Sequence, residues 1–268
     1  MKYDIIDFHH VASNCVALNE EKSIAVIRKL AVMTGILALP LVLATCSTML
    51  PQERLLVQPA AEQAPYAESS LKVMNLNLAH GRKDGLNQLL LSKSTISDNL
   101  ADIAAVLSQV DPDVVALQEA DGPSRWSGGF DHVERLADQA GYPAYVRTSH
   151  AGSWIFNYGT ALMSKVRFAD VLHHTFQPSP PTMNKGITLA QILWQADAGS
   201  GDVLLVDLIS VHLDFSRKSV REQQIAEIIQ VLAERDNPVI IMGDFNSDWF
   251  ADEKVVRTLA ESFGLQVY

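Results

Sequence analysis

The fold is decided by the stretch Val239-Ile240-Ile241-Met242-Gly243-Asp244-Phe245-Asn246, in which a short apolar run ends in two polar side chains. The apolar residues 238–242 are typical of a strand that is buried on both faces. Asp244 and Asn246 lie two residues apart and therefore project from the same face, and Gly243 permits the close approach of another backbone. The pair can position an attacking water or hold a phosphate oxygen or a metal ion, or it can close the strand as an Asx-type turn.

Two earlier strand ends also carry polar side chains. The apolar run 114–117 leads into Gln118 and Glu119, and the Glu119 carboxylate is either a hard oxygen ligand suited to magnesium or a solvent-facing loop acid. Asn77 lies at the end of an alternating run, beside His80 and Arg82, and is either a functional amide or a structural one that bonds the neighbouring backbone.

A fourth polar pair follows the apolar run 208–211. His212 and Asp214 are two residues apart and therefore share a face of the predicted strand. A histidine at this position can donate to a phosphate oxygen or act as an acid or base, or it can be a satisfied structural histidine. Each motif alone is weak evidence, and their common placement at strand ends predicts one site.

Strand and helix periods alternate along the chain from Leu71 onward. Ile96, Leu100, Ile103 and Leu107 fall on one face of a helix that ends before Asp111-Pro112, and His173-His174 are expected in a polar surface loop. The predicted strands are 71–78, 113–118, 145–148, 158–164, 187–195, 203–213 and 238–242, and the other predicted helices are 130–140, 220–234 and about 252–263. Several strands follow each other without a helix, which indicates a layered α/β fold with partly antiparallel sheets.

Composition limits the classes of partner. The 31 acidic and 21 basic residues give a net charge of −10, which argues against broad charge-driven binding to nucleic acid or anionic membranes. A local basic rim remains open, and its candidates are Arg82, Lys83, Lys185, Arg217 and Lys218. Two cysteines, Cys15 and Cys46, are too few for a thiolate zinc site.

The N-terminal residues 1–50 are typical of an export signal. Arg28 and Lys29 precede an apolar run, residues 30–45, that is shorter than a comfortable membrane span of about 20 residues. The run ends at Cys46 in a sequence that resembles a lipoprotein box, with Thr45 as a departure from that pattern. A lipoprotein lipidated on Cys46, an uncleaved anchor and a soluble secreted product are the alternatives. All three place the domain outside the cytoplasm, in the periplasm or cell envelope, and the first two anchor it to the membrane.

Residues 51–70, rich in Pro, Ala, Gln and Glu, are predicted to be a linker to a domain that covers residues 71–268. The polar motifs of this domain occur in an order that resembles the endonuclease/exonuclease/phosphatase superfamily, which includes deoxyribonuclease I, exonuclease III, neutral sphingomyelinases and inositol polyphosphate phosphatases. The segments that carry the resemblance are residues 75–81, 118–119, 159–164, 211–214 and 243–246.

The resemblance implies a four-layer α/β sandwich with two mostly antiparallel central sheets and a site for a magnesium-dependent phosphoric ester hydrolase; Mn²⁺ or another hard divalent cation is an alternative metal. By this resemblance, Glu119 binds the metal with help from Asn77, and Asp244 activates or orients the attacking water. Asn246 holds Asp244 or the phosphate in place, and His212 donates to the phosphate or the leaving oxygen. The expected substrate contacts are His80, Arg82 and Asp214.

One element of the family pattern is missing after residue 246. Members of the superfamily continue with a further strand and a Ser-Asp-His motif, whereas this chain ends at Tyr268 without a later histidine. We therefore expect a C-terminally incomplete fold, either a fragment or a truncated protein. One hypothesis is a monomeric, exported and membrane-tethered phosphoesterase that cleaves phosphodiesters of nucleic acid or phospholipid. The other is an impaired member that only binds a phosphate-bearing ligand or partner.

Overall fold

Two six-stranded sheets pack face to face in the computed structural model, which describes residues 4–9, 15–18, 52–54, 60, 63–197, 201–247 and 254–267. The first sheet, which we call sheet A, has the strand order β1-β4-β5-β7-β6-β3. Its strands are β1 (Asp4–His9), β3 (Gln52–Arg54), β4 (Ser70–Asn77), β5 (Val114–Asp121), β6 (Ala144–Gly152) and β7 (Asn157–Ser164). All neighbouring pairs except β4–β5 are antiparallel.

The second sheet, sheet B, is mixed and has the order β12-β2-β11-β10-β9-β8. Its strands are β2 (Cys15–Leu18), β8 (Asp170–Thr175), β9 (Gly186–Trp194), β10 (Leu204–His212), β11 (Val239–Asp244) and β12 (Gln266–Val267). The pairs β8–β9 and β9–β10 are antiparallel, whereas β10–β11, β11–β2 and β2–β12 are parallel.

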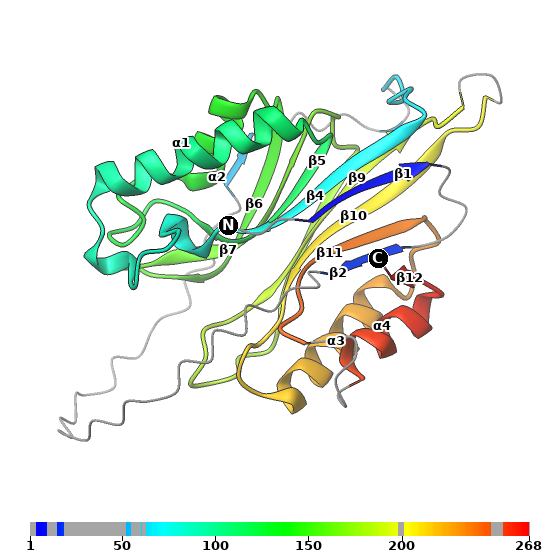
Figure 1. Cartoon of the computed structure of the whole chain (residues 1–268). Helices are drawn as coiled ribbons and strands as arrows, with labels where there is room; N and C mark the ends of the chain where they lie inside the picture. Colours follow the sequence, from blue (N-terminus) through cyan, green and yellow to red (C-terminus); the bar gives the residue numbers. More distant parts are fainter. Residues whose placement is uncertain are drawn as a thin grey trace.

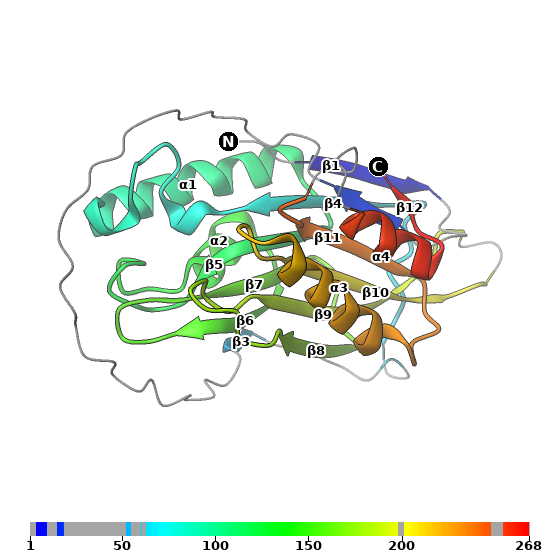
Figure 2. The same cartoon turned by 90° about the horizontal axis from the view of Figure 1, so that it is seen from below.

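Helices cover the outer face of each sheet, so the sandwich has four layers (Figures 1 and 2). Sheet A carries α1 (Lys93–Val110) and α2 (His132–Ala140), and sheet B carries α3 (Lys218–Leu232) and α4 (Val255–Phe263). The helices α1 and α3 are the crossovers of the parallel pairs β4–β5 and β10–β11. Local sequence sets their ends: the Ser92 and Asp131 side chains cap α1 and α2, and Gly141 and Gly264 end α2 and α4 in the left-handed conformation.

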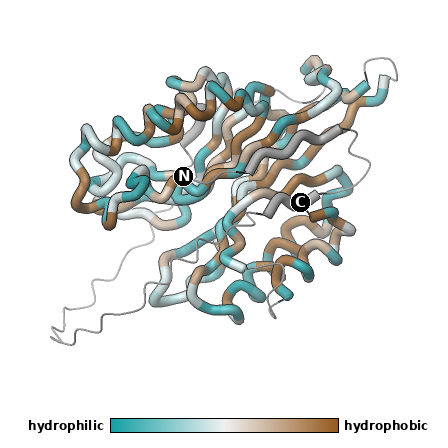
Figure 3. The backbone as a smooth tube through the Cα atoms, in the orientation of Figure 1, coloured by the Kyte–Doolittle hydropathy of each residue, from teal (hydrophilic) through white to brown (hydrophobic). Residues whose placement is uncertain are grey.

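Alternation along the strands divides the core among three interfaces. On β4, Val73 packs between the two sheets, whereas Met74 and Leu76 pack under α1 and α2. On β11, Ile240 and Met242 face sheet A and Ile241 faces α3 and α4. The tube of Figure 3 shows hydrophobic residues along these inner strands. The prediction that β11 is buried on both faces is therefore confirmed.

The predicted four-layer α/β fold is confirmed, and most element boundaries differ by only a few residues. Sheet A is mostly antiparallel, as predicted, whereas sheet B has three parallel pairs and two antiparallel pairs. One prediction was wrong: His173 and His174 belong to β8, an edge strand, rather than to a polar loop, and His174 Nε2 pairs with Glu227 of α3 at 2.7 Å. Four further strands, β1, β2, β3 and β12, lie in segments for which the sequence predicts no strand. Part of the last predicted helix, residues 252–253, lies outside the described residues.

The strand pairing sets the position of the polar strand ends. In sheet A, Asn77 is opposite Gln118, and in sheet B, His212 is opposite Asp244. A buried polar network ties the two pairs together just behind these ends, because Gln118 Nε2 donates to Asn75 Oδ1 at 2.9 Å and to Ser210 Oγ at 3.1 Å. The four strand ends therefore meet at one edge of the sandwich.

Candidate active site

A cleft of about 590 Å³ opens at the edge where β4, β5, β10 and β11 end. Both sheets contribute to it, together with the loop between β8 and β9 and the turn after β10. The residues that line it are His80, Glu119, Trp126, Tyr158, Pro181, Thr182, Met183, Lys185, His212, Phe215, Ser216, Asp244 and Asn246. Four of the polar residues predicted from strand ends therefore share one cleft, together with His80.

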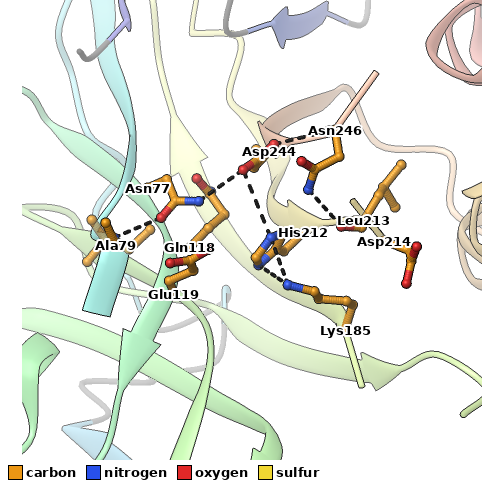
Figure 4. Close-up of polar contacts among 12 residues, drawn as sticks. Asn77, Ala79, Gln118, Glu119, Lys185, His212, Leu213, Asp214, Asp244 and Asn246 are labelled. Atoms are coloured by element: carbon orange, nitrogen blue, oxygen red, sulfur yellow. Dashed lines mark hydrogen bonds and ion pairs between the residues drawn. The ribbon is translucent and has the colours of Figure 1, made fainter. Parts of the chain in front are cut away.

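The Asp244 carboxylate joins the two sheets. Its Oδ2 accepts a hydrogen bond from Asn77 Nδ2 at 2.9 Å, and its Oδ1 accepts from the backbone N–H of Asn246 at 3.0 Å (Figure 4). The second bond forms an Asx turn. The Asp-Phe-Asn motif therefore closes the strand and also lies in the cleft. Gly243 is required here, because a Cβ atom would lie 2.1 Å from the carbonyl oxygen of Val211.

Asn77 and Asn246 are each held by a backbone group as well. Asn77 Oδ1 accepts from the N–H of Ala79 at 2.8 Å, and Asn246 Nδ2 donates to the carbonyl of Leu213 at 2.9 Å. Both amides therefore have a structural role, and Asn77 also has a role in orienting Asp244. With one lone pair of its carbonyl oxygen in use, Asn77 retains a second acceptor site.

Two buried basic side chains form the sheet B wall of the cleft. Lys185 Nζ lies 3.0 Å from Nε2 and 3.4 Å from Nδ1 of His212, and both residues are more than nine-tenths buried. Burial lowers the pKa of Lys185, although the charges of Glu119, Asp244 and Asp214 oppose this. Burial and the charge of Lys185 lower the pKa of His212 well below its usual value. A protonated lysine has no acceptor, so its ammonium donates to a neutral His212 ring.

The sheet A wall contains a chain of hydrogen-bonded residues. Trp126 Nε1 donates to Asp121 Oδ2 at 2.7 Å, His80 Nδ1 contacts Asp121 Oδ1 at 2.9 Å, and His80 Nε2 contacts Glu119 Oε2 at 3.1 Å. Burial lowers the pKa of His80, but the hydrogen bond to Asp121 and the charges of Asp121 and Glu119 raise it above its usual value. The ring lies between the two carboxylates, and its contact with Glu119 fixes the orientation of that side chain.

Left-handed backbone conformations are concentrated at this edge. His80, Glu119 and Asn246 have φ values of 56°, 49° and 48°, and all three line the cleft. In β5 the register shifts between Gln118 and Ala120, so Glu119 occupies a bulge that turns its side chain out of the regular alternation. Such conformations cost about 1–3 kcal/mol each and are typical of functional sites.

A family model described as the endonuclease/exonuclease/phosphatase family matches residues 74–259. The chain belongs to this family. Members of the endonuclease/exonuclease/phosphatase family are hydrolases that act on phosphate esters. The residues that meet in the cleft lie within the matched region, so the cleft is the candidate active site of a phosphoesterase fold.

The chain is similar to several solved structures, of which the first named below supports the fold assignment. An endonuclease/exonuclease/phosphatase family protein from Leptotrichia buccalis has 18% identity and a TM-score of 0.51, with 72% of each chain covered. A functionally unknown conserved protein from Enterococcus faecalis has 18% identity and a TM-score of 0.48, with 60% of this chain and 63% of that chain covered. TDP2 from D. rerio, complexed with a single-strand DNA product, has 20% identity and a TM-score of 0.45, with 70% and 64% covered.

The chain thus spans less than two thirds of the Enterococcus and D. rerio structures that it matches. A search of curated proteins finds no match. The family assignment therefore rests on the family model and on the shared fold.

Two residues predicted to bind substrate are not among the described residues that line the cleft. Asp214 accepts hydrogen bonds from the backbone of Ser216 and Arg217 and from the Thr182 hydroxyl, and Figure 4 shows it apart from the other labelled carboxylates. These bonds hold the pKa of Asp214 below its usual value, although burial opposes them. Arg82 donates to the carbonyl of Gly85.

His80, the third predicted substrate contact, lines the cleft, but both of its ring nitrogens already have carboxylate partners. Of the five basic rim candidates, Lys185 alone is among the residues lining the cleft. Lys83 pairs with Asp102, Lys218 with Glu222, and Arg217 bonds the carbonyl of Ser179. Cys46, the predicted lipidation site, lies outside the described residues.

Sequence reasoning missed Asp121 and Trp126. The only local signal for Asp121 is its position two residues after Glu119, at the end of the same apolar strand. The β-bulge at Glu119 breaks the alternation on which a prediction would rest, because it shifts the face to which each later residue points.

Proposed function

We propose that the chain hydrolyses a phosphodiester with the help of a divalent metal ion bound at the sheet A wall of the cleft. The observation that carries this proposal is the convergence of Glu119, Asn77, Asp244, His212 and Lys185 at one edge of the sandwich. The Glu119 carboxylate and the Asn77 amide oxygen come from sheet A, whereas the Asp244 carboxylate and the nitrogen groups of His212 and Lys185 come from the side of sheet B. This arrangement suits a ligand that carries both a bound cation and anionic oxygens.

The donor set fits Mg²⁺, or Mn²⁺ as the alternative hard cation. Within the described residues, no group of three or more His, Cys, Asp and Glu side chains could hold a metal. Mg²⁺ does not require such a group, since it retains several waters and uses one or two carboxylates together with substrate phosphates. Glu119 offers the carboxylate, and the second lone pair of Asn77 Oδ1 offers an amide oxygen. When bound, the ion would neutralise charge on the phosphoryl oxygens.

Asp244 is the residue that orients the attacking water. Its side chain is 31% exposed, which is enough for a water to reach it from the cleft. Its two oxygens are held by Asn77 and by the Asn246 backbone, so the carboxylate has a fixed direction. A carboxylate in a fixed direction can accept a proton from a water that attacks phosphorus.

Lys185 and His212 act on the opposite side of the phosphate. The sequence assigns the donor role to His212, but its Nε2 lies in contact with the Lys185 ammonium. In this arrangement, His212 orients Lys185, and the ammonium supplies the positive charge that stabilises negative charge developing in the transition state. A donor that is fixed before the reaction needs no reorganisation when that charge develops.

The test is to incubate the full chain with DNA, RNA, sphingomyelin, phosphoinositides and bis(4-nitrophenyl) phosphate in the presence of Mg²⁺. The proposal predicts release of product from at least one of these substrates, its loss in EDTA and its loss in Asp244→Ala. The matched control is Asp98→Ala, which removes an exposed carboxylate from α1. Binding of a substrate without turnover would instead support the hypothesis of a member that only binds phosphate-bearing ligands.

We also propose that the chain is exported and held at the cell envelope as a monomer. The support is the basic pair 28–29, the apolar run 30–45 and Cys46. These residues lie outside the described part of the chain, and no helix within the described part is long and apolar enough to span a membrane.

Cleavage of the export signal would change the two sheets. Cleavage before Cys46 would remove β1 and β2, which pair with β4 and β11, whereas an uncleaved anchor would retain them. The intact mass of the exported protein distinguishes these outcomes. A mass corresponding to a lipidated Cys46 supports the lipoprotein, and a full-length chain in the cytosolic fraction would contradict export.

A further inference from the structure

Exposed apolar side chains gather around the cleft. Seven of the eight large apolar residues that are exposed in the described chain lie in loops at the end of the sandwich where the cleft opens. The eighth, Val203, precedes β10 at the opposite end, because Leu204 pairs with Trp194 at the far end of β9. Single exposed apolar residues are ordinary, whereas a cluster at one site marks an interaction surface.

The seven residues form two lips, which together we call the apolar collar. The sheet A lip has Leu86, Leu89, Leu90, Trp154 and Ile155, and the sheet B lip has Met183 and Phe215. Their exposed fractions include 94% for Leu86, 80% for Leu90, 73% for Trp154 and 66% for Phe215. An isolated monomer in water gains nothing from such exposure, so the pattern requires an explanation from binding.

The collar is continuous with the cleft. Met183 and Phe215 line the cleft themselves. The carbonyl of Ile155 accepts the backbone N–H of Trp126, another lining residue, and the carbonyl of Trp154 accepts the N–H of Arg125. The leucines follow in the loop that begins at His80. A surface that contacts the collar would therefore cover the mouth of the cleft.

Six of the seven collar residues lie in short segments without charge. Residues 85–92, 151–157 and 178–184 contain no Asp, Glu, Lys or Arg, whereas Arg82, Lys83 and Asp84 precede the first segment and Phe215 lies between Asp214 and Arg217. A polyanion such as nucleic acid is held by Lys and Arg along its whole path, and the uncharged segments interrupt any such path. Neutral, apolar loops instead complement the interface of a zwitterionic bilayer.

The kind of apolar residue also discriminates between partners. Five of the seven are aliphatic, and only Trp154 and Phe215 are aromatic. Bases of a single strand stack on aromatic faces and gain little from leucine side chains, whereas acyl chains accept both kinds.

We propose that the apolar collar docks on a zwitterionic phospholipid bilayer and that the lipid headgroup phosphodiester is the substrate. This inference rests on the proposed function of the same cleft. In the reaction, the oxygen of water bonds to phosphorus and one P–O ester bond breaks. The products are a phosphomonoester and an alcohol, whose oxygen receives a proton. Docking places the headgroup plane against the cleft mouth while the acyl chains stay in the bilayer.

The experiment measures insertion of the collar itself, because the N-terminal apolar run can bind vesicles independently. The full chain is mixed with vesicles of brominated phosphatidylcholine, which quench tryptophan fluorescence at short range. The inference predicts quenching in the wild type that is substantially reduced in Trp154→Phe. Equal quenching in wild type and Trp154→Phe would overturn it.

A second measurement uses the opposite lip and a matched control. We expect Leu86→Ser/Leu90→Ser to lower the affinity of the protein for vesicles, as measured by this quenching, about 10-fold or more. Val203→Ser removes an exposed apolar side chain far from the cleft and should leave the affinity unchanged. The same affinity in all three proteins would contradict docking through the collar.

The two proposals can fail separately. Hydrolysis of bis(4-nitrophenyl) phosphate, a soluble substrate, should be the same in the wild type and in Leu86→Ser/Leu90→Ser. Soluble turnover without collar insertion would reject the bilayer inference and leave the proposed function intact. Collar insertion without turnover of any phosphodiester would reject the proposed function. Binding of oligothymidylate that is weakened by Trp154→Ser and not by the leucine substitutions would identify single-stranded nucleic acid as the occupant instead.

Discussion

The two walls of the cleft have opposite chemistry. On sheet A, the carboxylates of Glu119 and Asp121 lie on either side of the His80 ring. Burial lowers the pKa of His80, but the two carboxylates raise it more, so the net shift is upward. On sheet B, Lys185 and His212 are buried beside each other, and burial lowers both of their pKa values. One wall is built from acceptors held by hydrogen bonds, and the other is built from nitrogen donors with little access to water.

If the cleft binds a phosphate ester as proposed, each wall would contact that ester with a different set of groups. A cation held by the sheet A wall and the ammonium of the sheet B wall would approach the same phosphate from two sides. Asp244 lies where the walls meet, since it bonds Asn77 of sheet A and its Oδ2 lies 3.9 Å from His212 Nε2. Changes at the junction should therefore have larger effects than changes within one wall.

The largest effect is expected at the junction. Asp244→Asn keeps the shape of the side chain but removes the charge that accepts a proton from water, so kcat should fall about 10²- to 10⁴-fold. Steady-state kinetics on the substrate that gives the highest turnover measures this loss. A decrease of less than 10-fold, relative to Asp98→Asn as the surface control, would show that Asp244 does not act on the water.

A smaller effect is expected when the sheet B wall loses its charge. Lys185→Met should lower kcat/KM about 10²-fold, because a fixed donor at the developing charge is removed. Lys185→Arg retains the charge with a different shape and should recover part of the activity. If both variants lose activity equally, the shape of this wall rather than its charge is what matters.

A substitution in the sheet A wall should change the Mg²⁺ concentration that the reaction requires rather than kcat at saturating Mg²⁺. Asp121→Asn weakens the bond that orients His80 and hence Glu119, so the Mg²⁺ concentration that gives half the maximal rate should rise about 10-fold or more. At saturating Mg²⁺, the rate should return to near that of the wild type. The control Asp102→Asn removes an exposed carboxylate, and a similar shift in that variant would discount the role of Asp121.

The smallest effect concerns the interface behind both walls, where His150 Nδ1 contacts Thr175 of sheet B and its Nε2 contacts Thr160 of sheet A. Burial lowers the pKa of His150 to about 3, whereas an unfolded chain has a histidine pKa of about 6.5. The unfolded state therefore binds more protons between these values. Stability from this group is complete above pH 6.5 and is lost at about 1.4 kcal/mol per pH unit as the pH falls towards 3.

Urea unfolding at about pH 7.5 and about pH 5.5 checks this slope. His150→Gln should have a lower free energy of unfolding at the higher pH and a weaker dependence on pH than the wild type. The control Asp98→Asn changes an exposed side chain of α1 and leaves His150 and its partners intact. A pH dependence in His150→Gln that equals the wild-type dependence would contradict a neutral, buried His150.

Much of this fold follows from sequence periodicity. The strands that build the inner faces, such as β4 and β11, have regular alternation or wholly apolar runs, and their elements were predicted within a few residues. The strand β8 was missed because it lies at an edge, where half-exposed residues such as His173 and His174 are tolerated and no apolar period results. The pairing of β1 and β2 depends on distant partners, which local sequence does not specify.

The sequence predicts where side chains lie at strand ends, and it does not predict the contacts that tertiary packing decides. His212 and Asp244 end apolar strands and Glu119 lies near the end of β5, so their positions follow from the apolar runs before them. Lys185 lies in a Pro-rich loop, and only the fold buries its ammonium against His212. The position of Asp214 two residues after His212 predicted a shared direction, but the strand ends at His212 and the chain turns, so Asp214 bonds the turn instead.

The proposed function requires that the sheet A wall binds a divalent cation on which hydrolysis depends. The most direct test is the rate of bis(4-nitrophenyl) phosphate hydrolysis by the chain and by Glu119→Gln, each treated with EDTA and then supplied again with Mg²⁺. We expect EDTA to abolish the wild-type rate and Mg²⁺ to restore it, and we expect the rate of Glu119→Gln to stay low at the same Mg²⁺ concentration. A wild-type rate that persists in EDTA, or a Glu119→Gln rate equal to the wild-type rate, would contradict it.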